Sequence, residues 1–256
     1  MKSNAVLITG GTAGVGFAVA KLMASQGHTV AVTGRSAETG ARAEEELRTH
    51  SPGCIFVQGD AGDAAQGAAA VAETARRLGR IDVLVSSGAQ NPLGPMPFSQ
   101  MTAEQIESGF RTRVMGRILP VHAAIPFLRD AGGGSVVMIT TDAARHPTPG
   151  ESVIGASGAA VILLTKALAR ELARDRIRVN AVALTITSNT VGWDRMFANE
   201  NFGSKLFAKA IARFPSGRAP TAEEVSEAVA FLASDAASQV TGQTLSVNGG
   251  LSFGGW

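Results

Sequence analysis

Residues 9–16, Thr9-Gly10-Gly11-Thr12-Ala13-Gly14-Val15-Gly16, decide the fold of this 256-residue chain. The apolar run 5–8 precedes them directly, and an amphipathic stretch over 15–25 follows. Glycines at this spacing permit a tight turn and let the backbone approach a pyrophosphate, while the start of a helix offers free N–H groups and a favourable dipole. Because a strand and a helix flank the glycines, the segment predicts a dinucleotide-binding βα unit.

The same alternation of strand and helix continues to the end of the chain. Continuous short apolar runs, typical of strands covered on both faces, lie at 5–8, 29–33, 54–58, 83–86, 136–140, 179–183 and 244–247. Amphipathic stretches lie at 15–25, 37–50, 63–78, 102–128, 152–175 and 222–233. Thr221 and Glu224 predict a capping box at the start of the last one. We therefore expect an α/β fold with one doubly wound Rossmann-type domain over residues 1–256, in which helices cover both faces of a seven-stranded parallel sheet.

The least regular segment is 184–218, which follows a late strand. A long excursion at this place in an α/β sheet is a candidate lid. Its large apolar side chains favour an apolar acceptor site, although an ordinary insertion whose aromatic residues fill the core is the alternative. The side chains that favour an acceptor site are Trp193, Met196, Phe197 and Phe202, and Phe207 is a further aromatic residue of the segment.

Composition narrows the class of protein. Charged residues make up 17% of the chain, the net charge is +2, and Lys and Arg are scattered among acids, which argues against a nucleic-acid partner. The lone Cys54 lies in an apolar run and has no partner for an intrachain disulfide, which fits a reducing compartment. No charged leader or long apolar segment begins the sequence, so we expect no membrane association and a cytoplasmic location.

The pattern Thr-Gly-x-x-x-Gly-x-Gly resembles the short-chain dehydrogenase/reductase family, and the resemblance covers nearly the whole chain. It includes Asp60, which in that family faces the adenine, together with the segments 82–85, 178–182, 240–243 and 248–250. The resemblance implies a nicotinamide nucleotide as cofactor. The residues implied to hold it are Gly10, Thr12, Gly14, Val15, Gly16, Arg35, Asp60, Ala61, Ser87 and Gly88.

The end of the second strand distinguishes between the two cofactors. An acid there binds the ribose 2′-hydroxyl of NAD(H), whereas a base accommodates the 2′-phosphate of NADP(H). This chain has Gly34-Arg35-Ser36, and a guanidinium is suited to a phosphate. We therefore expect NADP(H), with NAD(H) as the alternative. A solvated Arg35 beside a vestigial nucleotide site is the remaining interpretation.

The resemblance also implies a catalytic tyrosine, a lysine four residues later, an earlier serine and an asparagine, yet the chain contains no tyrosine. Aligned by flanking residues, Ile154 stands at the tyrosine position and Gly158 at the lysine position, where we expect a hole and a weakened helix. Thr141 stands at the serine position and Arg113 at the asparagine position. Since Ile cannot exchange a proton, the ordinary mechanism is absent.

New polar side chains gather between the fifth strand and the next helix. They are Asp142, Arg145, His146 and Glu151, and ligands of α/β sheets bind at this end of the strands. An imidazole such as His146 can exchange protons near neutral pH. Arg113 could grip a carboxylate or phosphate, or form a structural ion pair. The candidate catalytic residues are thus Thr141, Asp142, His146 and Arg113; solvated loop side chains are the alternative, and no metal site is expected.

Two classes of function remain open. The first is a non-catalytic subunit that forms a homo-oligomer, as a dimer or tetramer, or a hetero-oligomer with a catalytically complete relative. The resemblance implies assembly through the stretches 102–128 and 152–175. The second is an oxidoreductase or non-redox enzyme with altered chemistry around Asp142, Arg145 and His146. A ligand-sensing protein and a conventional ketone/alcohol oxidoreductase are weaker alternatives.

Overall fold

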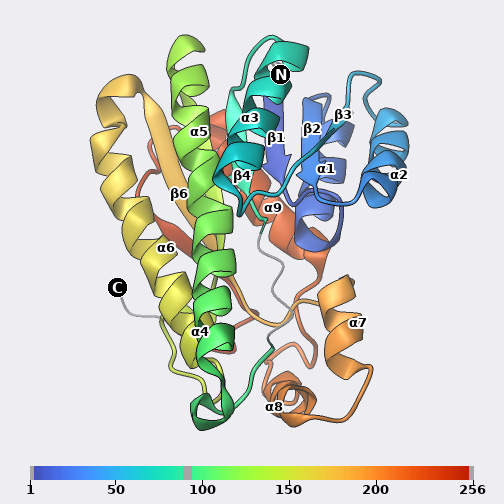
Figure 1. Ribbon diagram of the computed structural model, residues 1–256, viewed down its shortest axis with the longest axis vertical. Coiled ribbons are helices and arrows are strands. Elements are labelled where there is room, and N and C mark those ends of the chain that lie inside the picture. Colours follow the sequence, from blue (N-terminus) through green and yellow to red (C-terminus); the bar gives the residue numbers. More distant parts are fainter. Residues whose placement is uncertain (1–2, 89–93, 254–256) are drawn as a thin grey trace.

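The computed structural model describes residues 3–88 and 94–253, and it contains the expected parallel sheet (Figure 1). The strands are β1 Ala5–Thr9, β2 Thr29–Gly34, β3 Ile55–Gln58, β4 Val83–Ser86, β5 Gly134–Thr141, β6 Ile177–Leu184 and β7 Thr244–Val247. They are ordered β3-β2-β1-β4-β5-β6-β7, and every neighbouring pair is parallel. The prediction of a doubly wound, seven-stranded α/β fold is confirmed.

Two hydrophobic cores explain why the strands read as continuous apolar runs. On β1, Val6 and Ile8 point into one core and Leu7 into the other, and all three are fully buried. The first core is closed by α1 Gly14–Ser25, α2 Ala37–Arg48 and α9 Ala222–Ala233. The second is closed by α3 Ala64–Leu78, α5 Gly116–Asp130 and α6 Ser152–Glu171. The 222–233 helix begins with the expected capping box of Thr221 and Glu224.

The expected single helix over 102–128 is interrupted. A capping box at Thr102 starts α4 Ala103–Phe110, and five residues of π-helix, Arg111–Met115, separate α4 from α5. Figure 1 shows these elements as one long column beside α6. Single π turns inside α-helices frequently occur at functional sites. Arg113, the residue at the expected asparagine position, lies in the middle of this turn.

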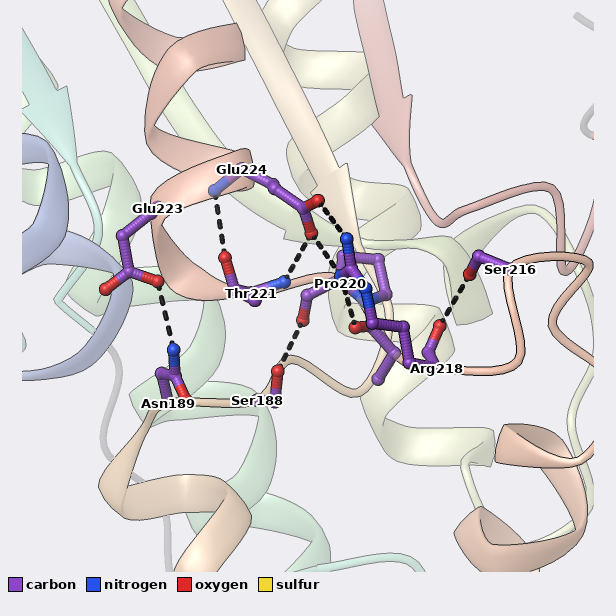
Figure 2. A network of polar contacts seen from close by, with 9 residues as sticks. Ser188, Asn189, Ser216, Arg218, Pro220, Thr221, Glu223 and Glu224 are labelled. Carbon is purple, nitrogen blue, oxygen red and sulfur yellow. Dashed lines mark hydrogen bonds and ion pairs between the residues drawn. The ribbon is translucent and has the colours of Figure 1, made fainter.

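The excursion 184–218 contains two short helices, α7 Val191–Phe197 and α8 Phe202–Ile211. Its two ends are joined at the start of α9, as Figure 2 shows. The Ser188 amide donates to the Pro220 carbonyl at 2.9 Å, and the Asn189 side chain donates to a Glu223 carboxylate oxygen at 3.3 Å. Hydrogen bonds therefore hold the start of the excursion to the start of α9.

One helix, α6, is long and apolar enough to cross a membrane by length and composition. Half of its most apolar window is buried inside the protein, and Val161 and Ala169 belong to the second core. The core helix of a soluble domain passes the same test. This helix alone is therefore weak evidence for a membrane span.

The remaining turns of 3₁₀-helix connect these elements. They are η1 Phe98–Gln100, η3 Asp142–Ala144, η4 Ala173–Asp175 and η5 Asp235–Ala237. Of these, η3 bears directly on the site, because it follows the carboxyl end of β5 and packs beneath α6.

Candidate functional site

The glycine turn after β1 is packed so closely against the loop after β4 that only glycine fits. Gly10 has φ +66°, and a Cβ there would lie 2.6 Å from the Cα of Gly88. The Ser87 amide donates to the Thr9 carbonyl at 3.2 Å, which holds the two loops together. The expected nucleotide-binding glycines are therefore brought together at the carboxyl edge of the sheet.

The helix that follows presents an open N-terminus. Its first residue is Gly14, and the preceding Ala13 provides no side-chain hydrogen bond to the first turn. The first amide groups of a helix are orphan donors and carry its positive dipole end. Because Gly14 and Val15 line the main cleft of the molecule, these donors face a space that a pyrophosphate fits.

The ends of β2 and β3 supply the other residues of the nucleotide end. A Cβ on Gly34 would meet the Thr12 hydroxyl oxygen at 2.8 Å, so the Thr12 side chain covers the end of β2 next to the exposed Arg35. After β3, an oxygen of Asp60 accepts from the Gly62 amide at 2.8 Å. Hydroxyl, guanidinium and carboxylate groups thus lie on adjacent strand ends, which fits the adenosine half of a nicotinamide nucleotide.

A cleft of about 1510 Å³ continues from this nucleotide end along the carboxyl ends of β5 and β6. Its walls come from α4, the π turn, α6 and the two helices of the excursion. Four of the expected catalytic candidates line it, as do the two degenerate positions: Arg113, Thr141, Asp142, His146, Ile154 and Gly158. The structure therefore places them in one cleft.

The expected hole at Gly158 does not exist. A Cβ at this position would lie 2.6 Å from the Thr141 Cγ2 atom and 3.0 Å from the Ala144 Cβ atom. Gly155, one turn earlier, is similarly close to the Ala143 carbonyl. Glycine lets α6 settle onto η3, so the space beside residue 158 is filled by protein and α6 remains a regular helix. Any side chain at position 158 would therefore require Thr141 or Ala144 to shift.

An apolar residue, Ile154, occupies the position aligned with the expected tyrosine. Ile154 is 9% exposed and lines the cleft on the same face of α6 as Ser157 and Val161. The Ser157 hydroxyl is buried and has no hydrogen-bond partner among the described residues. At the serine position, the Thr141 hydroxyl accepts from the Ala143 amide at 3.2 Å, so that oxygen caps η3.

Asp142 and Arg145 form hydrogen bonds with β7 and the segment after it, so they are not solvated loop side chains. One Asp142 oxygen accepts from the Ser246 hydroxyl at 2.7 Å, and the other accepts from the Asn248 amide and, at 3.0 Å, from the Ser252 hydroxyl. Arg145 donates to the same Ser246 hydroxyl at 3.0 Å and to the Thr244 carbonyl. Both side chains therefore fasten β7 and the segment after it to η3.

His146 differs from these two neighbours. Its side chain is partly buried, and its Nε2 atom has no hydrogen-bond partner within the described part of the chain. It lines the cleft, whereas the neighbouring Arg145 side chain turns toward β7. Of the loop residues singled out in the sequence, His146 has a buried ring nitrogen whose hydrogen-bonding capacity is unused among the described residues.

Arg113 and Glu151 both line the cleft, and the charge of each acts on the pKa of the other. Burial lowers the pKa of Arg113, and the negative charge of Glu151 opposes that change. Burial raises the pKa of Glu151, against the Thr148 hydrogen bond and the positive charge of Arg113. A carboxyl with a raised pKa in a cleft is a candidate for proton exchange.

Arg117 is a residue that the sequence analysis did not identify. Its Nε donates to the Ile139 carbonyl of β5, and its Nη1 donates to the Arg113 carbonyl at 2.7 Å. Burial lowers its pKa to about 10, with the nearby Arg113 charge acting in the same direction. The guanidinium therefore stays cationic at neutral pH. An arginine one residue after Gly116, within an otherwise apolar stretch, was the available signal.

The apolar side of the cleft comes from the excursion. Trp193, Met196, Phe202 and Phe207 line it, as expected for an apolar acceptor site. Phe197 packs against Trp193, with ring centroids 4.7 Å apart. No cluster of three His, Cys, Asp or Glu side chains suited to a metal occurs among residues 3–88 and 94–253.

Comparison with known proteins agrees with this geometry. The family model described as Enoyl-(Acyl carrier protein) reductase matches residues 10–252. The 3alpha-hydroxysteroid dehydrogenase of Mediterraneibacter gnavus is 33% identical over 252 residues, which cover 97% of each chain. The chain belongs to the short-chain dehydrogenase/reductase family.

Further relatives of this short-chain dehydrogenase/reductase are similar over nearly their whole length. The uncharacterized oxidoreductase YohF of Escherichia coli is 33% identical over 251 residues, covering 97% of this chain and 95% of the relative. The crystal structure of levodione reductase superposes with a TM-score of 0.88 at 28% identity and covers 97% and 98% of the two chains. Oxidoreductases that bind nicotinamide nucleotides are typical of the family, and the glycine turn and strand ends here fit that cofactor.

Proposed function

We propose that this protein binds NADP(H) but has lost tyrosine-dependent turnover, and that it works as a non-catalytic subunit of an oligomer. The observation that carries the proposal is the packing of α6. Ile154 stands at the aligned tyrosine position, and a Cβ at the aligned lysine position, Gly158, would crowd Thr141 and Ala144. Transfer of a hydride to a carbonyl carbon also needs a proton for the carbonyl oxygen. A positioned general acid raises the rate roughly 10²–10⁴-fold.

The preference for NADP(H) over NAD(H) is supported by Arg35 at the end of β2. Its guanidinium can pair with a 2′-phosphate, and the Thr12 hydroxyl lies over the adjacent Gly34. With Ile154 and Gly158 at the aligned tyrosine and lysine positions of α6, the nicotinamide ribose has no partner there, and binding is expected to be weak. Calorimetry with both reduced nucleotides measures the preference, and tighter binding of NADH than of NADPH would contradict it.

Assembly is supported by large apolar side chains left exposed on neighbouring helices. Leu163 on α6 is 70% exposed, and Phe110 at the end of α4 and Met115 in the π turn, two elements that contact α6, are 39% and 38% exposed. Side chains of this kind on a helix surface favour burial against a second chain. We propose a homodimer or tetramer when the chain is alone, and a hetero-oligomer with a catalytically complete relative when one is present.

The experiment that tests this role combines turnover with assembly. The purified chain should show no NADPH oxidation on a panel of ketones, and light scattering should find a dimer or tetramer. Co-expression with a relative that has the Tyr-x-x-x-Lys pair should yield a mixed oligomer. A stable monomer at micromolar concentration would remove the subunit role.

A second candidate, an enzyme with altered chemistry, is favoured by one specific observation. Glu151 lines the cleft with a raised pKa and acts on Arg113, and His146 in the same cleft has an Nε2 atom without a hydrogen-bond partner among the described residues. These groups could donate a proton or move one between two carbon atoms of a substrate. Turnover that is abolished by Glu151→Gln would establish this role and displace the first. A ligand sensor and a conventional ketone/alcohol oxidoreductase rank below both.

We infer a cytoplasmic location, without nucleic-acid or membrane partners. The proposal rests on the scattered charges, on the lone buried Cys54 and on the partial burial of α6 against the sheet. Recovery of the tagged protein in the soluble fraction, separate from membranes and the nucleoid, is the expected outcome.

A further inference from the structure

Asp142 is a buried carboxylate that takes its hydrogen bonds from one distant stretch of the chain. The residue is 5% exposed and forms no salt bridge with any of the described residues. One of its oxygens accepts from Ser246 on β7, and the other accepts from Asn248 and Ser252 beyond β7. A buried charge is unfavourable without such donors, so the carboxylate and this stretch stabilise each other.

The residues after β7 fold into a compact turn, 248–253, around the side chain of Asn248. This residue is 7% exposed, and its Nδ2 atom donates to the Ser252 carbonyl at 2.8 Å. Its Oδ1 atom accepts from the Gly250 amide at 3.0 Å, and its main-chain carbonyl accepts from the Leu251 amide at 3.0 Å. Asparagine side chains commonly close turns in this way. Because Nδ2 also donates to Asp142, Asn248 both closes the turn and joins it to η3.

The turn also packs against the end of the excursion. A Cβ on Gly249 would lie 3.0 Å from the Cδ1 atom of Phe214, which is itself 4% exposed. A Cβ on Gly250 would lie 3.3 Å from the Cγ atom of Pro215. The turn therefore contacts both η3 and the last residues of the excursion, two segments that lie far apart in the sequence.

One face of the turn belongs to the cleft. Leu251, Ser252 and Phe253 line it, and Phe253 is 84% exposed. Other parts of the lining are charged, at Arg195 and Arg213 for example, so the two large apolar side chains give this wall a local character. Such side chains offer dispersion contacts to a ligand and also take space from it.

We propose that Asp142 is a positioning residue that holds the turn 248–253 as a wall of the cleft, and that Leu251 and Phe253 on this wall limit the width of the ligand. A narrow apolar group fits beside the wall, whereas a bulky ring does not. Segments outside helices and strands are poorly ordered unless they are tied down, and the hydrogen bonds to Asp142 provide the tie. The wall requires neither bound nucleotide nor turnover, so it is compatible with a subunit, an enzyme or a sensor.

A thiol placed beside the turn measures the width of the cleft. Thr185 lines the cleft and follows Leu184, which pairs with Val247 at the end of β7, so it lies near the start of the turn. Cys54 is fully buried, and the wild type is therefore the unlabelled blank. In Thr185→Cys, methyl methanethiosulfonate should react much faster than benzyl methanethiosulfonate when each rate is normalised to that with free cysteine. The ratio of the two rates cancels changes in the reactivity of the thiol.

Release of the turn should remove this selectivity. Asp142→Asn presents an amide to the Asn248 amide, and it should raise the benzyl-to-methyl ratio at least about tenfold, because hydrogen bonds to a charged acceptor are lost. Phe253→Ala should raise the ratio by widening the cleft while the turn stays in place. The double variant Asp142→Asn with Asn248→Asp exchanges the amide and the carboxylate, so it should restore the low ratio.

Asp82→Asn is the matched control. Asp82 also holds a distant segment, since it accepts from the Ala5 amide at 2.9 Å, but it precedes β4 at the opposite end of the sheet. The substitution makes the same chemical change away from the cleft. It should leave the benzyl-to-methyl ratio of Thr185→Cys as it is.

Each contrary result has a definite meaning. Equal normalised rates of the two reagents in Thr185→Cys would show that no wall limits the width there. A low ratio in Asp142→Asn would overturn the positioning role, as would a high ratio in the exchanged double variant. A low ratio in Phe253→Ala would overturn the role of that ring. If circular dichroism shows that Asp142→Asn does not fold, Ser252→Ala takes its place, because it removes one donor to the carboxylate. A low ratio in Ser252→Ala would then decide against the wall.

Discussion

The Cγ2 atom of Thr141 lies 2.6 Å from the position that a Cβ at Gly158 would occupy. This relationship joins the end of β5 to α6, so any side chain at position 158 requires Thr141 to shift. Placing a tyrosine and a lysine at the aligned positions by Ile154→Tyr with Gly158→Lys should therefore not produce turnover. NADPH oxidation by the folded double variant on a ketone panel is the measurement, and activity near that of a complete relative would contradict the packing argument.

The same contact predicts a coupled effect on stability. Gly158→Ala should lower the free energy of unfolding by about 1–3 kcal/mol, as expected for overpacking a tight site. Thr141→Ser removes the Cγ2 atom and should recover much of that loss in the double variant. Denaturant unfolding of the four proteins measures the coupling. Additive effects of the two substitutions on the free energy of unfolding would show that α6 moves away from β5 in Gly158→Ala.

Arg35 should determine the choice of nucleotide. Arg35→Asp should reverse or abolish the preference for NADPH over NADH, because a carboxylate repels the 2′-phosphate and can bind the 2′-hydroxyl. Calorimetric affinities for both nucleotides provide the test. Arg170→Asp makes the same charge change at an exposed position on α6 and should leave the preference as it is. An unchanged preference in Arg35→Asp would assign Arg35 to the solvent.

Glu151 should make stability depend on pH in a defined direction. Its folded-state pKa is raised, mainly by burial, so its contribution is most favourable below the unfolded-state pKa of Glu and is lost as the pH rises through the folded-state pKa. Relative to Glu151→Gln, the wild type should lose stability as the pH increases from mildly acidic to neutral. Urea unfolding across this range measures the difference. A difference that does not change with pH would show that Glu151 is exposed to solvent in the native state.

Leu163 should separate assembly from folding. Leu163→Glu should yield folded monomers. The substitution should change the free energy of unfolding of the monomer by no more than about 0.5 kcal/mol, because the side chain is exposed and touches little of its own chain. Val161→Glu, two residues earlier but buried in the second core, should prevent folding. Ala72→Glu makes the same charge change at an exposed position on α3 and should leave the oligomer intact. Light scattering decides, and an oligomeric Leu163→Glu variant would place the interface elsewhere.

Local pattern was sufficient for much of the fold and for the nucleotide end. The glycine turn at 9–16, the seven apolar runs and the capping box at Thr221 each depend on residues near one another in the sequence. Rules for strand, turn and helix therefore identify them one by one. The same holds for the absence of a tyrosine, which the composition alone establishes.

The tertiary structure decided the chemistry of the cleft. Asp142 accepts hydrogen bonds from residues more than a hundred positions away, at Ser246 and Asn248, so the sequence could not show that this carboxylate is engaged. The filled space beside Gly158 depends on how closely α6 approaches β5. In the sequence, Arg117 is one more charged residue of a predicted helix. Only the structure shows that it donates to the Ile139 carbonyl of β5 and lines the cleft. Local sequence specifies which elements form, whereas burial, long-range hydrogen bonds and the balance of charge arise only when those elements pack together.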